Sequence, residues 1–256
     1  MSFNNKLILL TITLISLLQP LFAQDEKDQI FALDENWKGT DLKNARYLYH
    51  VKKLSDSCWQ WDSYNIIGPL IKTEYYKDKD ASIAHGQFYF YNAKGRIDSI
   101  HDYKNGLAEG SFYYFNDTGA VIFEKKYHNG ILYDSIDKLK RKVEAIRDSL
   151  QSVVFTKVES ESEFPGANGG WRRYLEKNFV YPERAINNKI QGMVIVQFIV
   201  DKEGNVQDPR IFKSVEYSID EEALRIIRKS PRWIPAQQNG RLVKSYKRQP
   251  IIFQLQ

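Results

Sequence analysis

Cysteine is nearly absent from this chain of 256 residues, which contains one cysteine and four histidines. Cys58 alone cannot form an intrachain disulfide, and it has no second cysteine as a partner in a metal site. The histidines do not have the spacing of metal ligands; they are His50, His85, His101 and His128. We therefore expect neither a disulfide nor a metal centre, a buried apolar role for Cys58, and solvated side chains for His101 and His128.

Motifs of catalysis and of cofactor binding are also missing. The sequence contains no Gly-x-Ser-x-Gly, no phosphate-binding loop and no paired zinc-ligand motif. Asp and Glu are numerous, but none of them forms a recognisable acid–base pair. We predict that the chain is not an enzyme and that it binds no cofactor.

Long apolar runs are limited to one segment at the start of the chain. The run from Leu7 to Leu18 is almost wholly apolar, follows Lys6 and precedes Pro20 and Ala23. It is shorter than the ~20 residues needed to span a bilayer. This predicts a secretory signal peptide, residues 1–23, cleaved after the small Ala23. An uncleaved segment that anchors the chain in the membrane is the alternative.

The C-terminal region, residues 164–256, has a pattern of apolar runs separated by turn signals. Met193–Val200 is apolar at all but one position, as expected of a strand buried on both faces. Pro209 lies in the following strand, residues 206–213, and Pro250 lies in the last strand. Because proline cannot donate a ladder hydrogen bond, both strands are expected at the edges of a sheet.

A helix is predicted between the last two strands. Ser218 and Glu221 have the spacing of a capping box, and Pro231 ends the helix. One helical face collects the apolar residues Ile219, Ala223, Ile226 and Ile227. Helices at 170–179 and 182–188 are expected on the same face of the sheet. The prediction is a three-stranded antiparallel sheet with its most apolar strand in the middle and its helices on one face.

Several short motifs of this region resemble the C-terminal domain of TonB-family proteins over about the last ninety residues. In order they are Phe164-Pro165-Gly166, Tyr181-Pro182-x-x-Ala185, Gly192-x-Val194-x-Val196-x-Phe198-x-Val200-Asp201, Glu222-Ala223, Pro231-x-Trp233-x-Pro235 and Pro250-Ile251-x-Phe253. The resemblance implies capture of an extended segment of a TonB-dependent outer-membrane transporter, and cleavage of the predicted signal peptide would leave the chain in the periplasm. An inner-membrane anchor through the uncleaved signal segment is the alternative location.

Capture of an extended segment works by strand addition, in which the exposed edge of a sheet pairs with a peptide. We expect the available edge on the last strand, ahead of Pro250. The predicted binding residues are Leu242, Val243, Ser245, Tyr246, Lys247 and Arg248. A proline at Ser245 would then remove one of the exposed backbone donors.

The chain departs from energy transducers of this family in two respects. Transducers have an N-terminal membrane helix coupled to a proton-driven motor, whereas this chain begins with a signal-like segment. They also have a proline-rich spacer, whereas this chain has repeats and a helix in its place. The chain is therefore either an accessory binder without a motor or a short, divergent transducer.

Residues 45–133 contain an internal repeat of 24 residues, with a weaker earlier copy. The matching positions are Gly86, Phe88, Tyr89, Asn92, Gly95, Tyr103, Asn105 and Gly106 in one copy and Gly110, Phe112, Tyr113, Asn116, Gly119, Tyr127, Asn129 and Gly130 in the next. The Asn-Gly pairs are hairpin signals, so the repeats predict an antiparallel β-meander. They resemble MORN-type repeats and are close in spacing to the YwqK-type antitoxin family. We expect their aromatic residues to pack within the sheet, with a ligand-binding surface as the alternative.

Two further segments complete an α+β organisation. Residues 24–44 form a short N-terminal segment. Residues 134–163 are predicted to be a linker with an amphipathic helix and an extended spacer, since apolar residues recur at helical spacing. These residues are Ile136, Leu139, Val143, Ile146 and Leu150.

Charge is distributed unevenly along the chain. Residues 164–256 contain 16 Lys and Arg against 9 Asp and Glu, a net charge of +7, and the remaining residues have a net charge of −2. An exported chain without a basic, aromatic stacking platform is not expected to bind nucleic acid. An acidic protein partner or an anionic membrane surface fits this charge, and a well-solvated surface without a partner fits it equally. In an alternative arrangement the C-terminal domain only forms a homodimer and the repeats bind the partner.

Overall fold

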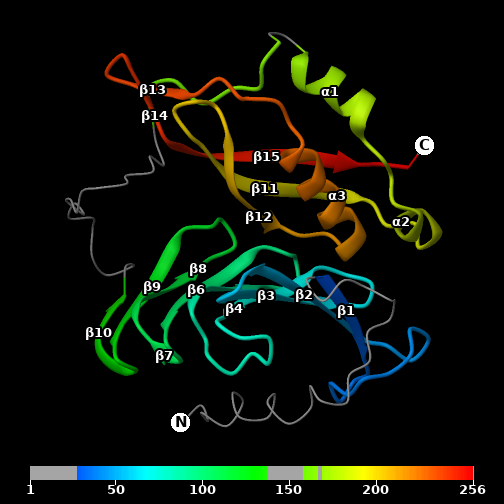
Figure 1. Ribbon diagram of the computed structural model, residues 1–256, viewed down its shortest axis with the longest axis vertical. Coiled ribbons are helices and arrows are strands. Elements are labelled where there is room, and N and C mark those ends of the chain that lie inside the picture. Colours follow the sequence, from blue (N-terminus) through cyan, green and yellow to red (C-terminus); the bar gives the residue numbers. More distant parts are fainter. Residues whose placement is uncertain (1–27, 138–157, 167–168, 256) are drawn as a thin grey trace. The chain divides into compact units, whose positions relative to one another are not determined.

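The computed structural model describes residues 28–137, 158–166 and 169–255. They form two compact units, the N-terminal unit (residues 28–137) and the C-terminal unit (residues 158–255) (Figure 1). The predicted signal peptide and the predicted linker helix beyond residue 137 lie outside the described residues.

The N-terminal unit is one antiparallel sheet of ten strands, which confirms the predicted meander. The strands are β1 (Asp28–Leu33), β2 (Tyr47–Ser55), β3 (Cys58–Asn65), β4 (Leu70–Tyr76), β5 (Gly86–Tyr91), β6 (Ile97–Lys104), β7 (Leu107–Ala108), β8 (Gly110–Phe115), β9 (Val121–His128) and β10 (Ile131–Asp137). Neighbours in sequence are neighbours in the sheet, except that β6 pairs with both β7 and β8. Most strands therefore follow their predecessor through a short connection, whereas residues 34–46 form a longer one between β1 and β2.

The sheet is longer at both ends than the repeats predicted. β1 lies before residue 45 and pairs with β2, and its Phe31 and Leu33 are buried. β10 continues to Asp137 and pairs with β9, so residues 134–137 are strand rather than the expected start of a helix. Ladder hydrogen bonds to β9 outweigh the helical spacing of the apolar residues there.

The hairpin turns have the geometry that the Asn-Gly pairs predicted. Asn105 and Gly106 have φ of 52° and 84°, and Asn129 and Gly130 have φ of 48° and 80°. Positive φ at both central residues defines the turn that matches the twist of a two-residue hairpin. Each turn also bonds to the preceding repeat, because the N–H of Gly106 donates to Ala84 and that of Gly130 to Ala108, both at 2.8 Å. The 24-residue repeat is thus a repeat of hydrogen bonds as well as of sequence.

Replacing Gly130 with valine is expected to destabilise the N-terminal unit by ~1 kcal/mol or more. The added Cβ would lie 3.5 Å from Leu107, an ordinary contact, so the cost arises from the positive φ. Gly130→Asn is the matched control, because asparagine tolerates this conformation. Urea unfolding measures both free energies, with tryptophan fluorescence reporting on each unit. Equal losses for valine and asparagine, or loss of the C-terminal unit in the same transition, would contradict this account.

Aromatic side chains form a continuous row across one face of the sheet. Successive ring centroids lie between 4.4 and 6.4 Å apart along the series Tyr49, Trp61, Tyr76, Phe88, Tyr103, Phe112 and Tyr127. Each ring belongs to the strand next to that of its neighbour, where cross-strand pairs stabilise a sheet. Trp61, Phe88 and Phe112 are buried. The aromatic residues of the repeats therefore pack within the unit, as expected.

His101 and Cys58 differ from their predicted environments. The His101 ring stacks on Phe112, with centroids 4.2 Å apart and an angle of 5° between the planes, so the expected solvated position is wrong. Its Nε2 is buried with no hydrogen-bond partner among the described residues. Burial and the nearby charge of Lys125 lower the pKa of His101 to about 4. Cys58 is half-buried at the start of β3 rather than buried.

The stability of the N-terminal unit is expected to fall as the pH decreases from 6.5 towards 4. The folded unit holds His101 neutral, with a pKa of about 4, whereas the unfolded chain binds a proton near pH 6.5. Protonation therefore favours unfolding, by up to ~3 kcal/mol below both pKa values. Urea unfolding of the parent chain and of His101→Phe at several pH values measures the effect. The variant should lose this pH dependence, and equal pH profiles would contradict the assignment.

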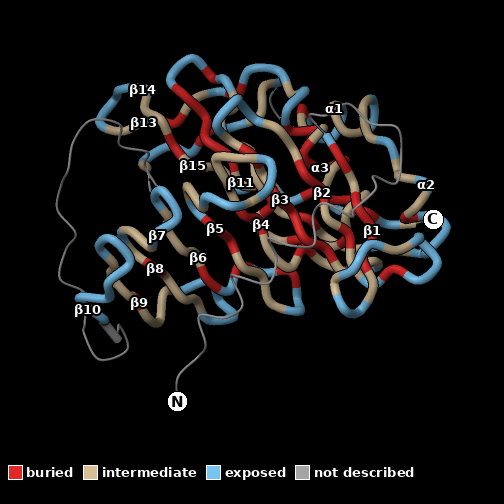
Figure 2. The backbone as a smooth tube through the Cα atoms, turned by 60° about the horizontal axis from the view of Figure 1, so that its bottom comes forward, coloured by how far each residue is buried: buried red, intermediate tan, exposed pale blue. Residues whose placement is uncertain are grey.

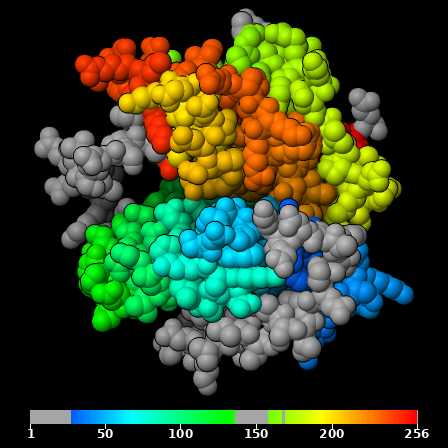
Figure 3. Space-filling model, in the orientation of Figure 1, coloured from blue at the N-terminus to red at the C-terminus, as the bar shows by residue number. Residues whose placement is uncertain are grey.

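The C-terminal unit has the predicted three-stranded antiparallel sheet. Its order is β12 (Val206–Lys213), β11 (Gly192–Val200) and β15 (Ser245–Phe253), with the apolar β11 in the middle. A small hairpin of β13 (Ala236–Gln238) and β14 (Arg241–Val243) precedes β15. The helices are α1 (Gly170–Asn178), α2 (Glu183–Asn187) and α3 (Tyr217–Arg228). Figure 3 shows α1 in yellow-green and α3 in orange at the surface of this unit.

Helix α3 buries its own predicted apolar face, and the tube in Figure 2 marks buried residues in this helix. Ile219, Ala223, Ile226 and Ile227 have no exposed surface. The predicted capping box at Ser218 is wrong, because the N-cap lies two residues earlier, at Glu216, whose carboxylate accepts the N–H of Ser218 at 2.8 Å. Arg184 of α2 also donates to Glu216, at 2.6 Å. This contact between distant residues fixes the start of the helix.

Candidate partner-binding edge

Strand β15 forms one edge of the three-stranded sheet. All nine of its residues pair with β11, from Ser245 opposite Val200 to Phe253 opposite Gly192. Within residues 158–166 and 169–255, no strand pairs with its other side. This outer side of β15, called here the outer edge, is the candidate site.

The six predicted binding residues are divided between two strands. Leu242 and Val243 belong to β14 and pair with Gln237 and Ala236 of β13. Only the later four, Ser245, Tyr246, Lys247 and Arg248, lie on β15. The continuous edge expected from residue 242 onward is therefore wrong, because the β13–β14 hairpin occupies its first part.

Pro250 identifies which backbone groups of β15 point outward. In an antiparallel pair, alternate residues direct both N–H and C=O towards the partner strand. Pro250 has no N–H, so its position opposite Ile195 fits a residue whose backbone groups point away from β11. Its carbonyl oxygen accepts a hydrogen bond from Nε2 of Gln249 at 3.2 Å, which agrees with an outward direction. By alternation, the backbone groups of Tyr246, Arg248 and Ile252 also point outward.

The same alternation changes the role expected for Ser245. Its N–H falls in the set that faces β11, and the residue is only 1% exposed. A proline at Ser245 would therefore remove a hydrogen bond within the sheet rather than an exposed donor. Tyr246 is the nearest position at which proline removes an outward N–H.

The side chains of β15 alternate between the two faces of the sheet. Ser245, Ile251 and Phe253 are buried on the face that α3 covers. Arg248, Pro250 and Ile252 are exposed on the opposite face, which we call the open face. A strand added at the outer edge would present its own residues to these two different environments in alternation.

An arginine is held across the open face. Nε of Arg248 donates to the side-chain oxygen of Gln197 on β11 at 2.9 Å, and its guanidinium carbon lies 3.7 Å from the centre of the Phe212 ring on β12. Arg210 approaches the Tyr246 ring, at 5.8 Å. Burial and the charge of Arg210 lower the pKa of Arg248 below its usual value. Sequence reasoning placed Arg248 at the site but missed its partners, which come from two other strands.

A second case of strand pairing occurs within the same unit. Ser160 and Glu163, ahead of α1, pair with Gln237 and Ile234 through isolated antiparallel bridges. The Glu159 carboxylate accepts the N–H of Asn239 at 2.9 Å. An extended segment of the chain itself thus lies along β13, so β13 is paired on both of its sides.

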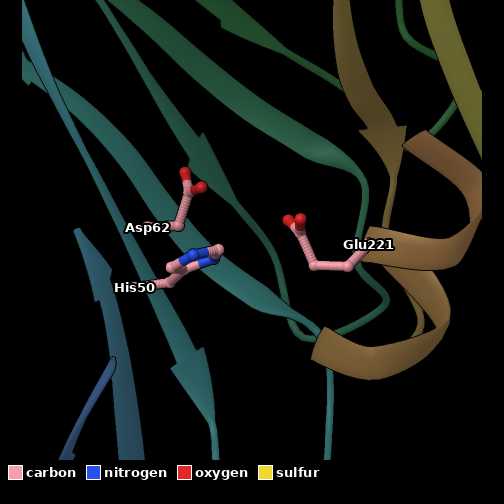
Figure 4. Close-up of side chains that lie close together, drawn as sticks. All are labelled: His50, Asp62 and Glu221. Atoms are coloured by element: carbon pink, nitrogen blue, oxygen red, sulfur yellow. The ribbon is translucent and has the colours of Figure 1, made fainter. Parts of the chain in front are cut away.

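His50 and Asp62 are buried opposite one another on β2 and β3 of the N-terminal unit (Figure 4). A structural zinc site takes four ligands, of which this pair could supply two. The Asp62 carboxylate accepts hydrogen bonds from Thr73 at 2.6 Å and from Gln60 at 2.7 Å. The bond from Thr73 joins β3 to β4, and the bond from Gln60 holds the second carboxylate oxygen within β3.

Among the residues described by the structure, none belongs to a helix that is long and apolar enough to cross a membrane.

Comparison with known families supports one part of the sequence-based resemblance. The family described as the C-terminal domain of the Gram-negative bacterial TonB protein matches residues 177–255. Searches of curated proteins and of solved structures found no match. The matched residues include β11, β12, α3 and β15. The C-terminal unit is therefore similar to the C-terminal domain of TonB proteins, and the candidate edge lies inside the matched region.

Proposed function

We propose that this chain is an exported, periplasmic binding protein that captures an extended segment of a TonB-dependent outer-membrane transporter by strand addition at the outer edge of β15. The observation that carries the proposal is this edge, which lacks a partner strand among the described residues of the C-terminal unit, in the region that matches the TonB family. The chain acts through binding and has no catalytic role of its own.

The chemistry of the edge supports recognition through the backbone. Outward N–H and C=O groups at Tyr246 and Arg248 offer ladder hydrogen bonds to any extended segment. The side chains supply selectivity, because residues on the two faces of the incoming strand meet different surfaces. The net charge of +7 over residues 164–256 favours the approach of an acidic partner.

The fate of residues 1–23 determines what capture achieves. If the signal peptide is cleaved, the mature protein starts at Gln24 and acts as an accessory binder, without a link to an inner-membrane motor. If it stays, the chain is anchored and acts as a short transducer. N-terminal sequencing of the protein isolated from cells is expected to find Gln24. Intact Met1-bearing protein confined to the membrane fraction would contradict the accessory role.

The alternative is a scaffold in which the MORN-like repeats bind the partner and the C-terminal unit only dimerises. The continuous aromatic row of the N-terminal unit supports this scaffold alternative, because aromatic residues are frequent anchors in binding surfaces. Titration of the full mature chain with synthetic periplasm-facing transporter segments tests both proposals. The strand-addition proposal expects equal dissociation constants for the parent and Gly130→Val. Loss of binding in Gly130→Val, with the C-terminal unit still folded, would instead support the scaffold.

A further inference from the structure

The open face of the C-terminal sheet contains a guanidinium group that is fixed in place but not neutralised. Arg248 is anchored at two points, by the hydrogen bond from Nε to Gln197 and by the stacking of its guanidinium on Phe212. No carboxylate of the described residues lies within ion-pair distance of Arg248. Its two terminal nitrogens therefore retain their N–H donors, in the planar arrangement that matches the two oxygens of a carboxylate.

Fixing the guanidinium in advance has an energetic consequence. A free arginine loses much of its side-chain entropy when it binds an anion, whereas Arg248 has already lost it by packing against Phe212. The positive charge of Arg210, on β12, repels that of Arg248, and a bound anion would reduce this repulsion. Both effects favour binding of a negatively charged group at this position.

The surroundings of Arg248 indicate what kind of molecule carries that group. Ile252, on the same face of β15, is 67% exposed, and the Tyr246 ring lies 5.8 Å from the guanidinium of Arg210. Apolar and aromatic contacts around a fixed arginine are the composition of a protein-binding surface. The charge of the region, +7 over residues 164–256, complements an acidic partner.

We propose that the open face, centred on Arg248, binds an acidic segment of a partner protein, with a glutamate or aspartate carboxylate on the Arg248 guanidinium. This surface is distinct from the outer edge, because it uses side chains that lie across β11 and β12 rather than the backbone of β15. A partner that occupies the edge and the open face together would gain affinity from both.

The test uses the full mature chain and two labelled ten-residue peptides that differ only in charge. One peptide alternates threonine and glutamate, and the other alternates threonine and glutamine. Fluorescence polarisation at low salt is expected to find the glutamate peptide bound about tenfold more tightly. Added salt should reduce this advantage, because it screens exposed charges.

Variants of Arg248 connect the effect to one residue. Arg248→Gln should remove the advantage of the glutamate peptide, and Arg248→Lys should restore only part of it, because lysine cannot form the planar pair. Arg241→Gln, on the β14 strand, is the control for general loss of charge and should keep the advantage. Equal binding of the two peptides to the parent chain, no binding of either, or an advantage that survives Arg248→Gln would overturn the proposal.

Strand addition is separated from this site by comparing Tyr246→Pro with Tyr246→Ala, which lose the same ring but differ in the backbone N–H. If the open face acts independently, the glutamate advantage is the same in both variants even when only Tyr246→Pro no longer binds transporter segments. A different outcome would overturn the open-face site alone: Tyr246→Pro loses transporter binding, but the parent chain binds the two peptides equally. Strand addition would then remain in place.

Discussion

Replacing Tyr246 with proline is expected to abolish binding of an extended transporter segment while leaving the C-terminal unit folded. The backbone N–H of Tyr246 points away from β11 by the alternation that Pro250 sets, so proline removes a donor that the folded unit does not use. An incoming strand would lose a ladder hydrogen bond and meet a ring in its place. Calorimetric titration with a transporter segment measures the loss as a change in the dissociation constant.

Two variants control for the other effects of this substitution. Tyr246→Ala removes the same aromatic side chain but keeps the N–H, and its dissociation constant should stay within about threefold of the parent value. Lys247→Pro removes an N–H that faces β11 and should destabilise the unit by about 2 kcal/mol or more. Unchanged binding in Tyr246→Pro, or equal destabilisation by the two prolines, would contradict the assigned alternation.

Replacing Gly204 with alanine is expected to destabilise the C-terminal unit by about 3 kcal/mol or more. Gly204 ends the turn between β11 and β12 with φ of 86°, and an added Cβ would lie 2.2 Å from the carbonyl oxygen of Trp233. The N–H of Trp233 donates to Gly204 at 2.8 Å, so the two backbones cannot separate without losing this bond. Trp233 is 3% exposed and contacts the rings of Phe164, Trp171 and Phe198.

Gly240→Ala is the matched control for this prediction. Gly240 also has a positive φ, 69°, but a Cβ added there meets nothing within 4 Å. Its cost should therefore be limited to the backbone conformation, ~1 kcal/mol. Urea unfolding followed by tryptophan fluorescence gives both values. Similar losses for the two alanine variants would show that the approach to Trp233 is not the source of the strain.

Local signals in the sequence were sufficient for much of the C-terminal fold. The apolar run Met193–Val200 predicted the central strand, since only a strand covered on both sides has so few polar residues. Pro209 and Pro250 placed their strands at the edges, because proline cannot take part in a full ladder. These signals depend on the chemistry of single residues and need no knowledge of distant contacts.

The errors in the fold arose where a contact between distant residues decided the local structure. Ser218 had the spacing of a capping residue, but Glu216 caps α3 and also receives Arg184 of α2. His101 lies in a repeat and was expected in solvent, but it stacks on Phe112 of a neighbouring strand. A single sequence does not give the strand register that brings such residues together.

Only part of the site was predicted, because the strand register cannot be read from a single sequence. Tyr246, Lys247 and Arg248 were placed on an edge strand because Pro250 follows them. Leu242 and Val243 were added because the β13–β14 hairpin has only three residues in each strand, too few for a clear alternation pattern. The fixed position of Arg248 depends on Gln197 and Phe212, which meet it only after three strands are aligned.

Amide hydrogen exchange along β15, measured by NMR with and without a bound transporter segment, tests strand addition most directly. In the free chain, the amides of Tyr246 and Arg248 should exchange quickly and those of Lys247 and Gln249 slowly, because only the latter bond to β11. Bound segment should slow exchange at Tyr246 and Arg248 and leave Lys247 and Gln249 nearly unchanged. Fast exchange at Tyr246 and Arg248 in the saturated complex would contradict strand addition at this edge.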